Sequence, residues 1–90
     1  MNVSRLFDQI DQRIKLAHEI KSKEKVFISD NFLWSVHLMY NKAAMFKKWN
    51  VVVLYKDNVM IDKSFRKYED ALKFYEACVR EVKKRYNSKR

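Results

Sequence analysis

The residues that most often catalyse reactions or bind metals are few in this chain. It holds two histidines, His18 and His37, and one cysteine, Cys78. A metal site needs several converging Cys, His or carboxylate ligands, and these three residues show no recognisable ligand spacing. Cys78 falls on the apolar stripe of an expected helix, where a buried thiol is unreactive. The sequence therefore predicts no metal, no other cofactor and no cysteine nucleophile.

Four acidic residues cluster around an expected β-hairpin, at Asp57, Asp62, Glu69 and Asp70. Each has a structural explanation, as a turn former, a strand surface residue or part of the first turn of a helix. The chain also has no glycine and no proline. This excludes glycine-rich loops that cradle phosphates, because their backbone must approach the ligand where a Cβ atom would collide. We therefore expect a protein that is not an enzyme.

Basic residues interleaved with aromatic ones are the strongest functional signal. The formal net charge is +9, and residues 46–90 carry +7 of it, with 13 Lys or Arg against 6 Asp or Glu. Lysine and arginine neutralise phosphates, and bases can stack on exposed aromatic rings. This pattern favours nucleic acid as the partner, DNA rather than RNA. The candidate contacts are Lys47, Lys48, Lys56, Lys63, Arg66, Lys67, Arg80, Lys83, Lys84 and Arg85.

The pattern predicts an amphipathic helix over residues 3–24, because apolar residues recur every three or four positions. Its stripe consists of Val3, Leu6, Phe7, Ile10, Ile14, Ala17 and Ile20. We expect this stripe to lie on the core of its own chain. The alternative is a seam between two copies in a homodimer.

Two segments follow whose pattern is less clear. Residues 26–28 are short, apolar and β-branched, so they form either a third short strand or a packed connector. Residues 31–48 alternate as a strand does from Phe32 to Tyr40, while Ala43–Phe46 favours a helix. We predict a second helix over 31–48, with Ser29–Asn31 as its N-cap cluster.

Residues 49–65 are predicted to form a β-hairpin with a turn at Asp57–Asn58. This turn places on the core face Val52, Leu54, Val59, Ile61 and Phe65. The opposite face carries Trp49, Val51, Val53 and Tyr55 and is too apolar to face water. Another element or a protein partner must therefore cover it.

A last helix is predicted over residues 67–87, so the chain is read as one α+β domain, 1–90, with two N-terminal helices, an antiparallel hairpin and a long C-terminal helix. The longest apolar runs have four residues, well short of a membrane span, and no signal peptide is visible. A single cysteine is typical of a reducing compartment. We expect a cytoplasmic protein that does not enter membranes.

Part of this pattern resembles a known kind of DNA-binding module. The residues are Trp49-x-Val51, the hairpin, and Phe65-x-Lys67-x-Glu69-Asp70-Ala71 opening a helix. They resemble the three-stranded, one-helix modules of AP2-like and arm-type integrase domains, over fewer than forty residues. The resemblance implies a sheet laid into the DNA major groove, with Lys56, Lys63 and Arg66 in contact. Lys67 replaces the expected capping threonine, and the turn lacks glycine.

Three functional hypotheses follow. The first is a small DNA-binding accessory or regulatory protein of a phage or mobile element, because the size and composition resemble such proteins. The second is an adaptor or inhibitor that docks on another protein through Trp49, Val51, Val53 and Tyr55. The third is a winged-helix protein, which needs a turn hidden near Asn41–Lys42.

Overall fold

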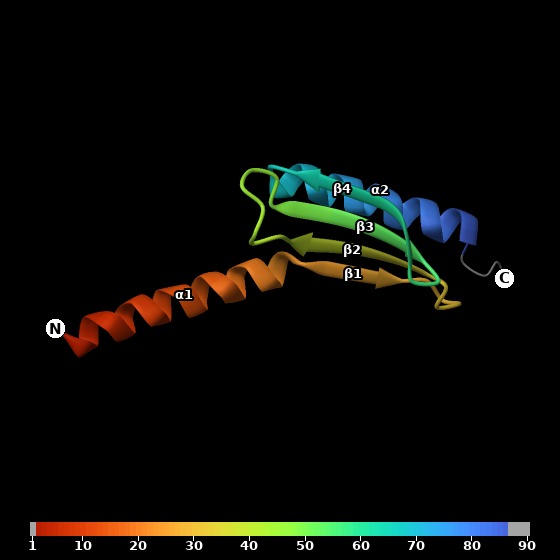
Figure 1. Ribbon diagram of the computed structural model, residues 1–90. Helices are drawn as coiled ribbons and strands as arrows, with labels where there is room; N and C mark the ends of the chain where they lie inside the picture. Colours follow the sequence, from red (N-terminus) through yellow and green to blue (C-terminus); the bar gives the residue numbers. More distant parts are fainter. Residues whose placement is uncertain (1, 87–90) are drawn as a thin grey trace.

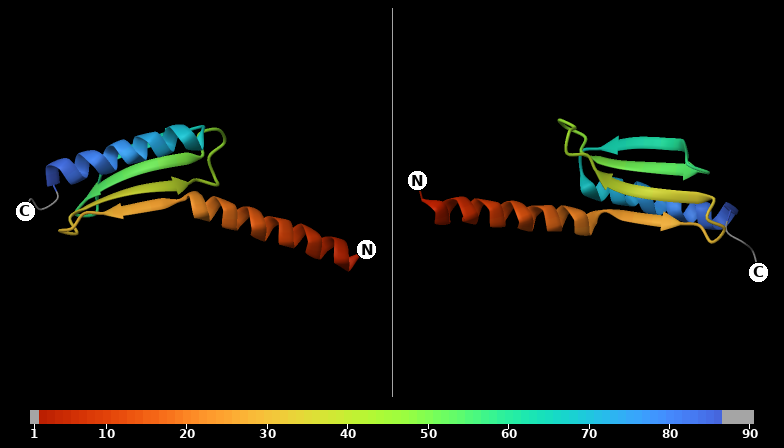
Figure 2. Two further views of the ribbon diagram at one scale, coloured as in Figure 1. Left: turned by 180° about the vertical axis from the view of Figure 1, so that it is seen from behind. Right: turned by 60° about the horizontal axis from the view of Figure 1, so that its bottom comes forward.

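The computed structural model describes residues 2–86 and consists of one antiparallel sheet with a helix before it and a helix after it (Figure 1). The elements are α1 (Val3–Lys23), β1 (Lys25–Ile28), β2 (Trp34–Tyr40), β3 (Trp49–Tyr55), β4 (Asn58–Phe65) and α2 (Tyr68–Tyr86). The four strands lie in sequence order, each paired with the next. Helix α2 covers one face, mainly over β2 and β3, whereas α1 projects beyond the sheet (Figure 2).

The predicted second helix over 31–48 is wrong, and with it the arrangement of two N-terminal helices before a hairpin. Residues 34–40 form β2, which pairs with β3 from Trp34↔Tyr55 to Tyr40↔Trp49. The alternation of apolar residues was therefore the correct signal, while Ala43–Phe46 lies in the β2–β3 loop. The physical reason is that an isolated two-stranded hairpin is marginal in water, and additional strands supply the missing pairing. The optional strand near 26–28 exists, as β1.

The predicted N-cap cluster forms the β1–β2 turn instead. The Ser29 side chain is buried, and its Oγ donates to Asn31 Oδ1 at 2.6 Å and accepts from the Trp34 amide at 3.0 Å. Asn31 Nδ2 donates to the Tyr86 carbonyl at 3.2 Å, which ties this turn to the end of α2. Phe32 has a φ of 61°, an uncommon conformation for a bulky residue. These side-chain hydrogen bonds let the chain reverse here without glycine.

The core lies between α2 and the face of the sheet that α2 covers. Val36 and Leu38 of β2 and Val51 of β3 are fully buried. The residues of α2 that join them are Ala71, Tyr75 and Val82. This arrangement agrees with the predicted last helix, although residue 87 lies outside the described part of the chain.

The face predicted to be an exposed protein interface is the core face. Trp49, Val51 and Val53 are buried and Tyr55 is half-buried, all on the side of α2. Trp49 packs edge-on against Tyr68 of α2, with ring centroids 4.9 Å apart. Of the two covers that were expected for this face, another element or a protein partner, the first is present, because α2 covers it.

The faces of β3 were assigned wrongly because a bulge changes the strand register, whereas Ile61 and Phe65 of β4 do lie on the predicted core side. The two-residue turn is Lys56–Asp57, since Tyr55 pairs with Asn58, and both turn residues have positive φ, 47° and 67°. A bulge then shifts the register, so that Leu54 pairs with Val59 but Val53 pairs with Ile61. The change of turn alone moves the pairing by two positions and keeps the faces, but the single extra residue of the bulge reverses which β3 side chains face the core.

The opposite face of the sheet has no helix over it. It is mixed in character and carries, from β1 to β4, Val26, Ile28, Ser35, His37, Met39, Asn50, Val52, Leu54, Val59, Asp62 and Ser64. His37 therefore lies on a strand, where Nε2 is 2.9 Å from Ser35 Oγ. In the described strands this face carries no lysine or arginine, because the strand pairing places Lys25 and Lys63 on the side of α2.

Helix α1 has the predicted extent but not the predicted position. Asn2 caps it, with Oδ1 accepting from the Ser4 amide at 3.0 Å. None of its residues is buried, and within it only Ile20 is half-buried. The expectation that its apolar stripe lies on the core of its own chain is therefore wrong except at Ile20, which packs against the core.

Candidate nucleic-acid interface

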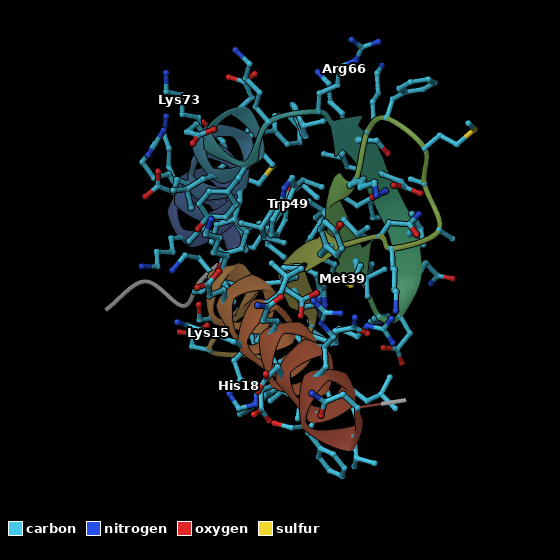
Figure 3. All side chains as sticks on the ribbon, turned by 90° about the vertical axis from the view of Figure 1, so that its left-hand side faces the viewer. Lys15, His18, Met39, Trp49, Arg66 and Lys73 are labelled. Carbon is cyan, nitrogen blue, oxygen red and sulfur yellow. The ribbon has the colours of Figure 1, made fainter. Side chains whose placement is uncertain are left out.

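Three basic segments that are far apart in the sequence meet at one end of the sheet. They are the end of α1, the β2–β3 loop (residues 41–48) and the β4–α2 connection (residues 66–67). The strand register brings them together, because Trp49 pairs with both Tyr40 and Phe65. Figure 3 looks at this end, with α1 running toward the viewer, Arg66 at the top and Trp49 deeper inside.

Specific contacts hold the three segments in place. The Lys23 ammonium lies 5.3 Å from the centroid of the Tyr68 ring, which joins the end of α1 to the start of α2. The Arg66 guanidinium lies 5.7 Å from the Phe46 ring, which joins the β4–α2 connection to the β2–β3 loop. Such cation–π contacts are individually weak at exposed sites, about 0.5–1 kcal/mol. Together they fix the relative positions of the three segments.

Two hydrogen bonds donated by backbone amides close the base of this end. The Asn41 amide donates to the Lys48 carbonyl at 2.6 Å and closes the β2–β3 loop. The Tyr40 amide donates to the Glu24 carboxylate at 2.9 Å. Glu24 is the residue between α1 and β1, so this bond holds the junction of these two elements against β2.

We call the resulting surface the basic end. It consists of Lys23, Lys42, Lys47, Lys48, Arg66 and Lys67, all exposed except Lys48, which is half-buried. The neighbouring acids are Glu24 and, in the first turn of α2, Glu69 and Asp70. Six cations against three acids leave a formal charge of +3 on a small part of the surface. Phe46 is 69% exposed there and offers a ring on which a base could stack.

The structure brings together four of the ten predicted contact residues, Lys47, Lys48, Arg66 and Lys67. Lys23 and Lys42, which are not among those ten, lie beside them. Both lysines lie in basic stretches that are visible in the sequence, Lys23 at the end of α1 and Lys42 in the loop after Tyr40. Only the strand pairing shows that these two stretches lie close together.

The other predicted contacts lie elsewhere. Lys56 is in the β3–β4 turn at the opposite end of the sheet, and Lys84 and Arg85 are in the last turn of α2. Lys83 lies 5.4 Å from the Phe27 ring of β1, and Arg80 lines a hollow on the same side with Lys25. These residues do not form one surface with the basic end.

The three contacts implied by the AP2-like resemblance do not share a face. Lys63 points to the side of α2, with its ammonium 5.0 Å from the Phe74 ring. Arg66 lies beyond the end of β4, and Lys56 lies in the turn at the other end. The open face of the described strands, which would have to enter a groove of DNA, carries Asp62 and no lysine or arginine. The resemblance itself stays a prediction.

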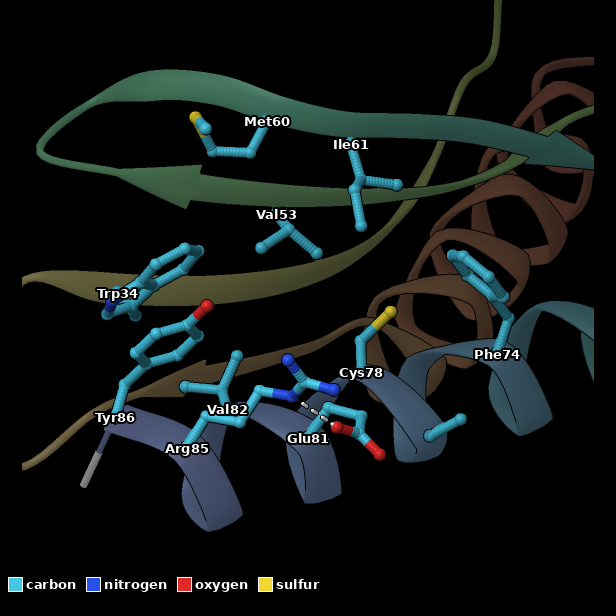
Figure 4. A pocket seen from close by; sticks show the side chains of 11 residues that line it. Trp34, Val53, Met60, Ile61, Phe74, Cys78, Glu81, Val82, Arg85 and Tyr86 are labelled. Atoms are coloured by element: carbon cyan, nitrogen blue, oxygen red, sulfur yellow. Dashed lines mark hydrogen bonds and ion pairs between the residues drawn. The ribbon is translucent and has the colours of Figure 1, made fainter.

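An apolar groove of about 450 Å³ lies between α2 and the β3–β4 hairpin (Figure 4). Trp34 and Tyr86 stack at one end of it, with ring centroids 4.2 Å apart, and Phe74 lies at the other. Cys78 lines the groove, and burial raises the pKa of its thiol. A raised pKa keeps the thiol protonated at neutral pH, which opposes a nucleophilic role.

An ion pair stands at the rim of this groove. Arg85 Nε donates to Glu81 Oε2 at 2.7 Å, one helical turn apart. This hydrogen bond lowers the pKa of the Glu81 carboxyl and raises the pKa of Arg85. Because Glu81 stays ionised and paired, it is poorly suited to proton transfer at neutral pH. Arg85 is likewise engaged by a neighbouring acid.

Within residues 2–86, no three His, Cys, Asp or Glu side chains gather closely enough to hold a metal ion. Neither described helix combines the length and the apolar character needed to cross a membrane. No protein-family model, curated protein or solved structure matches the chain. The geometry of the basic end is therefore the main guide to function.

Proposed function

We propose that this protein binds nucleic acid, DNA rather than RNA, through the basic end, as an accessory or regulatory protein. The observation that carries the proposal is the convergence of three basic segments on one end of the sheet. Each segment alone is an ordinary charged stretch, whereas together they present six cations to one partner. A partner with regularly spaced phosphates matches such a surface best.

The proposed contact is mainly with the phosphate backbone of the nucleic acid. Lysine predominates in the basic end, and lysine acts as a point charge toward phosphate rather than as a reader of base edges. Arg66 and Phe46 are the exceptions, since a guanidinium and an exposed ring can stack on bases. We expect modest sequence preference and strong dependence on salt. The proposal also places the protein in the cytoplasm, where a lone cysteine stays reduced.

The test is the change in affinity when the charges of the basic end are reversed. The variant carries Lys47→Glu, Lys48→Glu and Arg66→Glu. Its matched control carries Lys56→Glu, Lys83→Glu and Lys84→Glu. Both changes lower the formal charge from +9 to +3, so long-range attraction falls equally. Fluorescence anisotropy with a labelled duplex, a single-stranded DNA and a single-stranded RNA, at about 50 mM salt, reports binding.

We expect the basic-end variant to lose at least about tenfold more affinity than the control, with both variants folded by circular dichroism. For the unmodified protein, log affinity should fall linearly with log salt, with a slope of about −0.9 for each contacted phosphate on duplex DNA. Equal losses in the two variants would show that only bulk charge acts, and would remove the basic end from the proposal. Absence of any affinity at low salt would end it.

A further inference from the structure

The apolar stripe of α1 is exposed from Val3 to Ala17, and Ile20 at its end is half-buried against the core. Phe7 is 58% exposed, Ile14 51% and Ile10 44%, and Val3 and Leu6 are exposed as well. A 21-residue helix that stands alone is marginal in water, because most helical stability in proteins comes from packing an apolar face. The stripe therefore needs a covering surface.

The same chain cannot supply this cover in the observed arrangement. Glu24 is the single residue between α1 and β1, and its backbone is extended, with φ −71° and ψ 144°. The Glu24 carboxylate accepts a hydrogen bond from the Tyr40 amide, which fixes Glu24 to β2. A helix that folded back over the sheet would need a reversing turn here. The helix instead leaves the sheet almost in line with β1 (Figure 1).

The spacing of the stripe matches a helix of identical sequence. Val3, Phe7, Ile10, Ile14 and Ala17 are separated alternately by four and three residues, which is the heptad pattern of a coiled coil. Lys21 occupies the next position and ends the apolar run. We propose that α1 pairs with α1 of a second copy of this chain, in an antiparallel coiled coil.

Charge and side-chain size favour the antiparallel orientation. A parallel pair would set two basic ends, each with a formal charge of +3, side by side at the same end of the coiled coil. An antiparallel pair separates them by the length of α1. It also sets the large Phe7 opposite the small Ala17, and Ile10 opposite Ile14.

The available area agrees with a dimer of modest strength. Two stripes of half-exposed Val, Leu, Phe and Ile side chains would together remove on the order of 1,000 Å² from water, the lower limit for a specific interface. We therefore expect a concentration-dependent equilibrium between monomer and dimer. Its dissociation constant should be in the micromolar range, about 1–100 μM.

The test is sedimentation equilibrium of the full chain between about 5 and 300 μM, a range chosen around that affinity. The unmodified protein should shift from monomer to dimer. The variant Ile10→Asp with Ile14→Asp should weaken the dimer at least about 100-fold, because charges would enter the seam. The control Gln12→Asp with Ser22→Asp adds the same charge to the polar face and should still dimerise. The sheet domain of each variant is checked by its tryptophan fluorescence and thermal unfolding.

Orientation is tested by oxidative cross-linking in a Cys78→Ser background. An antiparallel pair brings Val3 near Lys21 of the second copy. Chains carrying Val3→Cys and chains carrying Lys21→Cys should therefore cross-link when mixed, and neither should cross-link with itself. Self-linking of Val3→Cys chains would show a parallel pair and overturn the orientation.

Two results would overturn the proposal as a whole. One is a monomer at every concentration, whether or not α1 then binds vesicles of anionic lipid. The other is a dimer that survives the double aspartate change, since this would place the interface elsewhere. The proposal does not rest on nucleic-acid binding, so the charge-reversal experiment can fail without affecting it.

Discussion

Lys23 and Tyr68 lie 45 positions apart in the sequence, and the lysine ammonium is 5.3 Å from the centroid of the tyrosine ring. The same ring packs edge-on against Trp49 at 4.9 Å. Tyr68 thus contacts the end of α1 on one side and the core of the sheet on the other. It links the basic end to the folded core.

Replacing Tyr68 with alanine should therefore lower the stability of the fold. Loss of a half-buried ring against Trp49 should reduce the free energy of unfolding by about 2 kcal/mol. In a domain of this size, that corresponds to a fall in melting temperature of roughly 10 °C. Urea unfolding measures the free energy of unfolding, and calorimetry measures the melting temperature. Tyr68→Phe is the control, because it keeps the ring, and a similar loss in that variant would contradict the packing argument.

The turn between β3 and β4 gives a second prediction. Lys56 and Asp57 both have positive φ, which costs free energy in residues other than glycine, asparagine or aspartate. Changing Lys56–Asp57 to Asn–Gly should stabilise the protein by about 0.5–1 kcal/mol. The same dipeptide placed one residue later, at 57–58, puts glycine in β4 and should give no gain. Equal effects of the two changes in urea unfolding would refute the turn assignment.

The hairpin also shows why sequence reasoning placed the strands correctly but reversed the faces of β3. The strands were recognisable from their β-branched residues. Their register depended on a one-residue choice of turn and on a bulge after Val53. Asp57–Asn58 and Lys56–Asp57 differ little as turn signals, because an aspartate and a following polar residue suit either position. Since the side-chain period of a strand is two, the turn error, which moves the pairing by two positions, keeps the faces, whereas the bulge moves it by one and exchanged the core and open faces of β3.

Residues 34–40 and α1 illustrate a different limit. Trp34 to Tyr40 had a strand pattern, but the strand needs β3 as a partner, and such distant pairing is not visible in a local window. The amphipathic stripe of α1 showed that one face must be covered. The stripe did not show which surface covers that face, because a heptad spacing suits both packing on the core of the same chain and pairing with a second helix. The basic end was hidden for the same reason, since Lys23, Lys48 and Arg66 meet only through the sheet register.

A third prediction concerns the Cys78 thiol. Burial raises its pKa, so the folded chain holds the thiol proton more tightly than the unfolded chain does. The associated stabilisation is fully present below the ordinary thiol pKa, about 8.5, and is lost as pH rises through the higher folded value. The free energy of unfolding should therefore fall as pH rises above about 8.5. Tyr75, whose pKa is raised by burial and then by Glu76, adds a similar loss at higher pH.

Urea unfolding between about pH 7.5 and 9.5 isolates the cysteine, because tyrosines titrate mainly above this range. The Cys78→Ala variant should be somewhat less stable at neutral pH, because a small cavity forms. Its stability should nevertheless fall less steeply with pH than that of the unmodified chain. Parallel profiles for the two proteins would show that Cys78 does not contribute to the loss.

The last prediction joins the two proposals and depends on both. An antiparallel pair of α1 helices separates the two basic ends by about the length of a 21-residue helix, roughly 30 Å. One turn of B-DNA spans a similar distance, about 34 Å. A dimer could therefore contact one face of a duplex at two places, and the second contact would be effectively intramolecular.

Affinity for a duplex of about 24 base pairs should then exceed affinity for one of about 10 by more than the ratio of available sites. The Ile10→Asp, Ile14→Asp variant should lose this advantage but bind the short duplex as well as the equally charged Gln12→Asp, Ser22→Asp control, because its basic end is unchanged. Loss of affinity for both duplexes to the same extent would indicate that α1 touches the nucleic acid itself rather than pairing two copies.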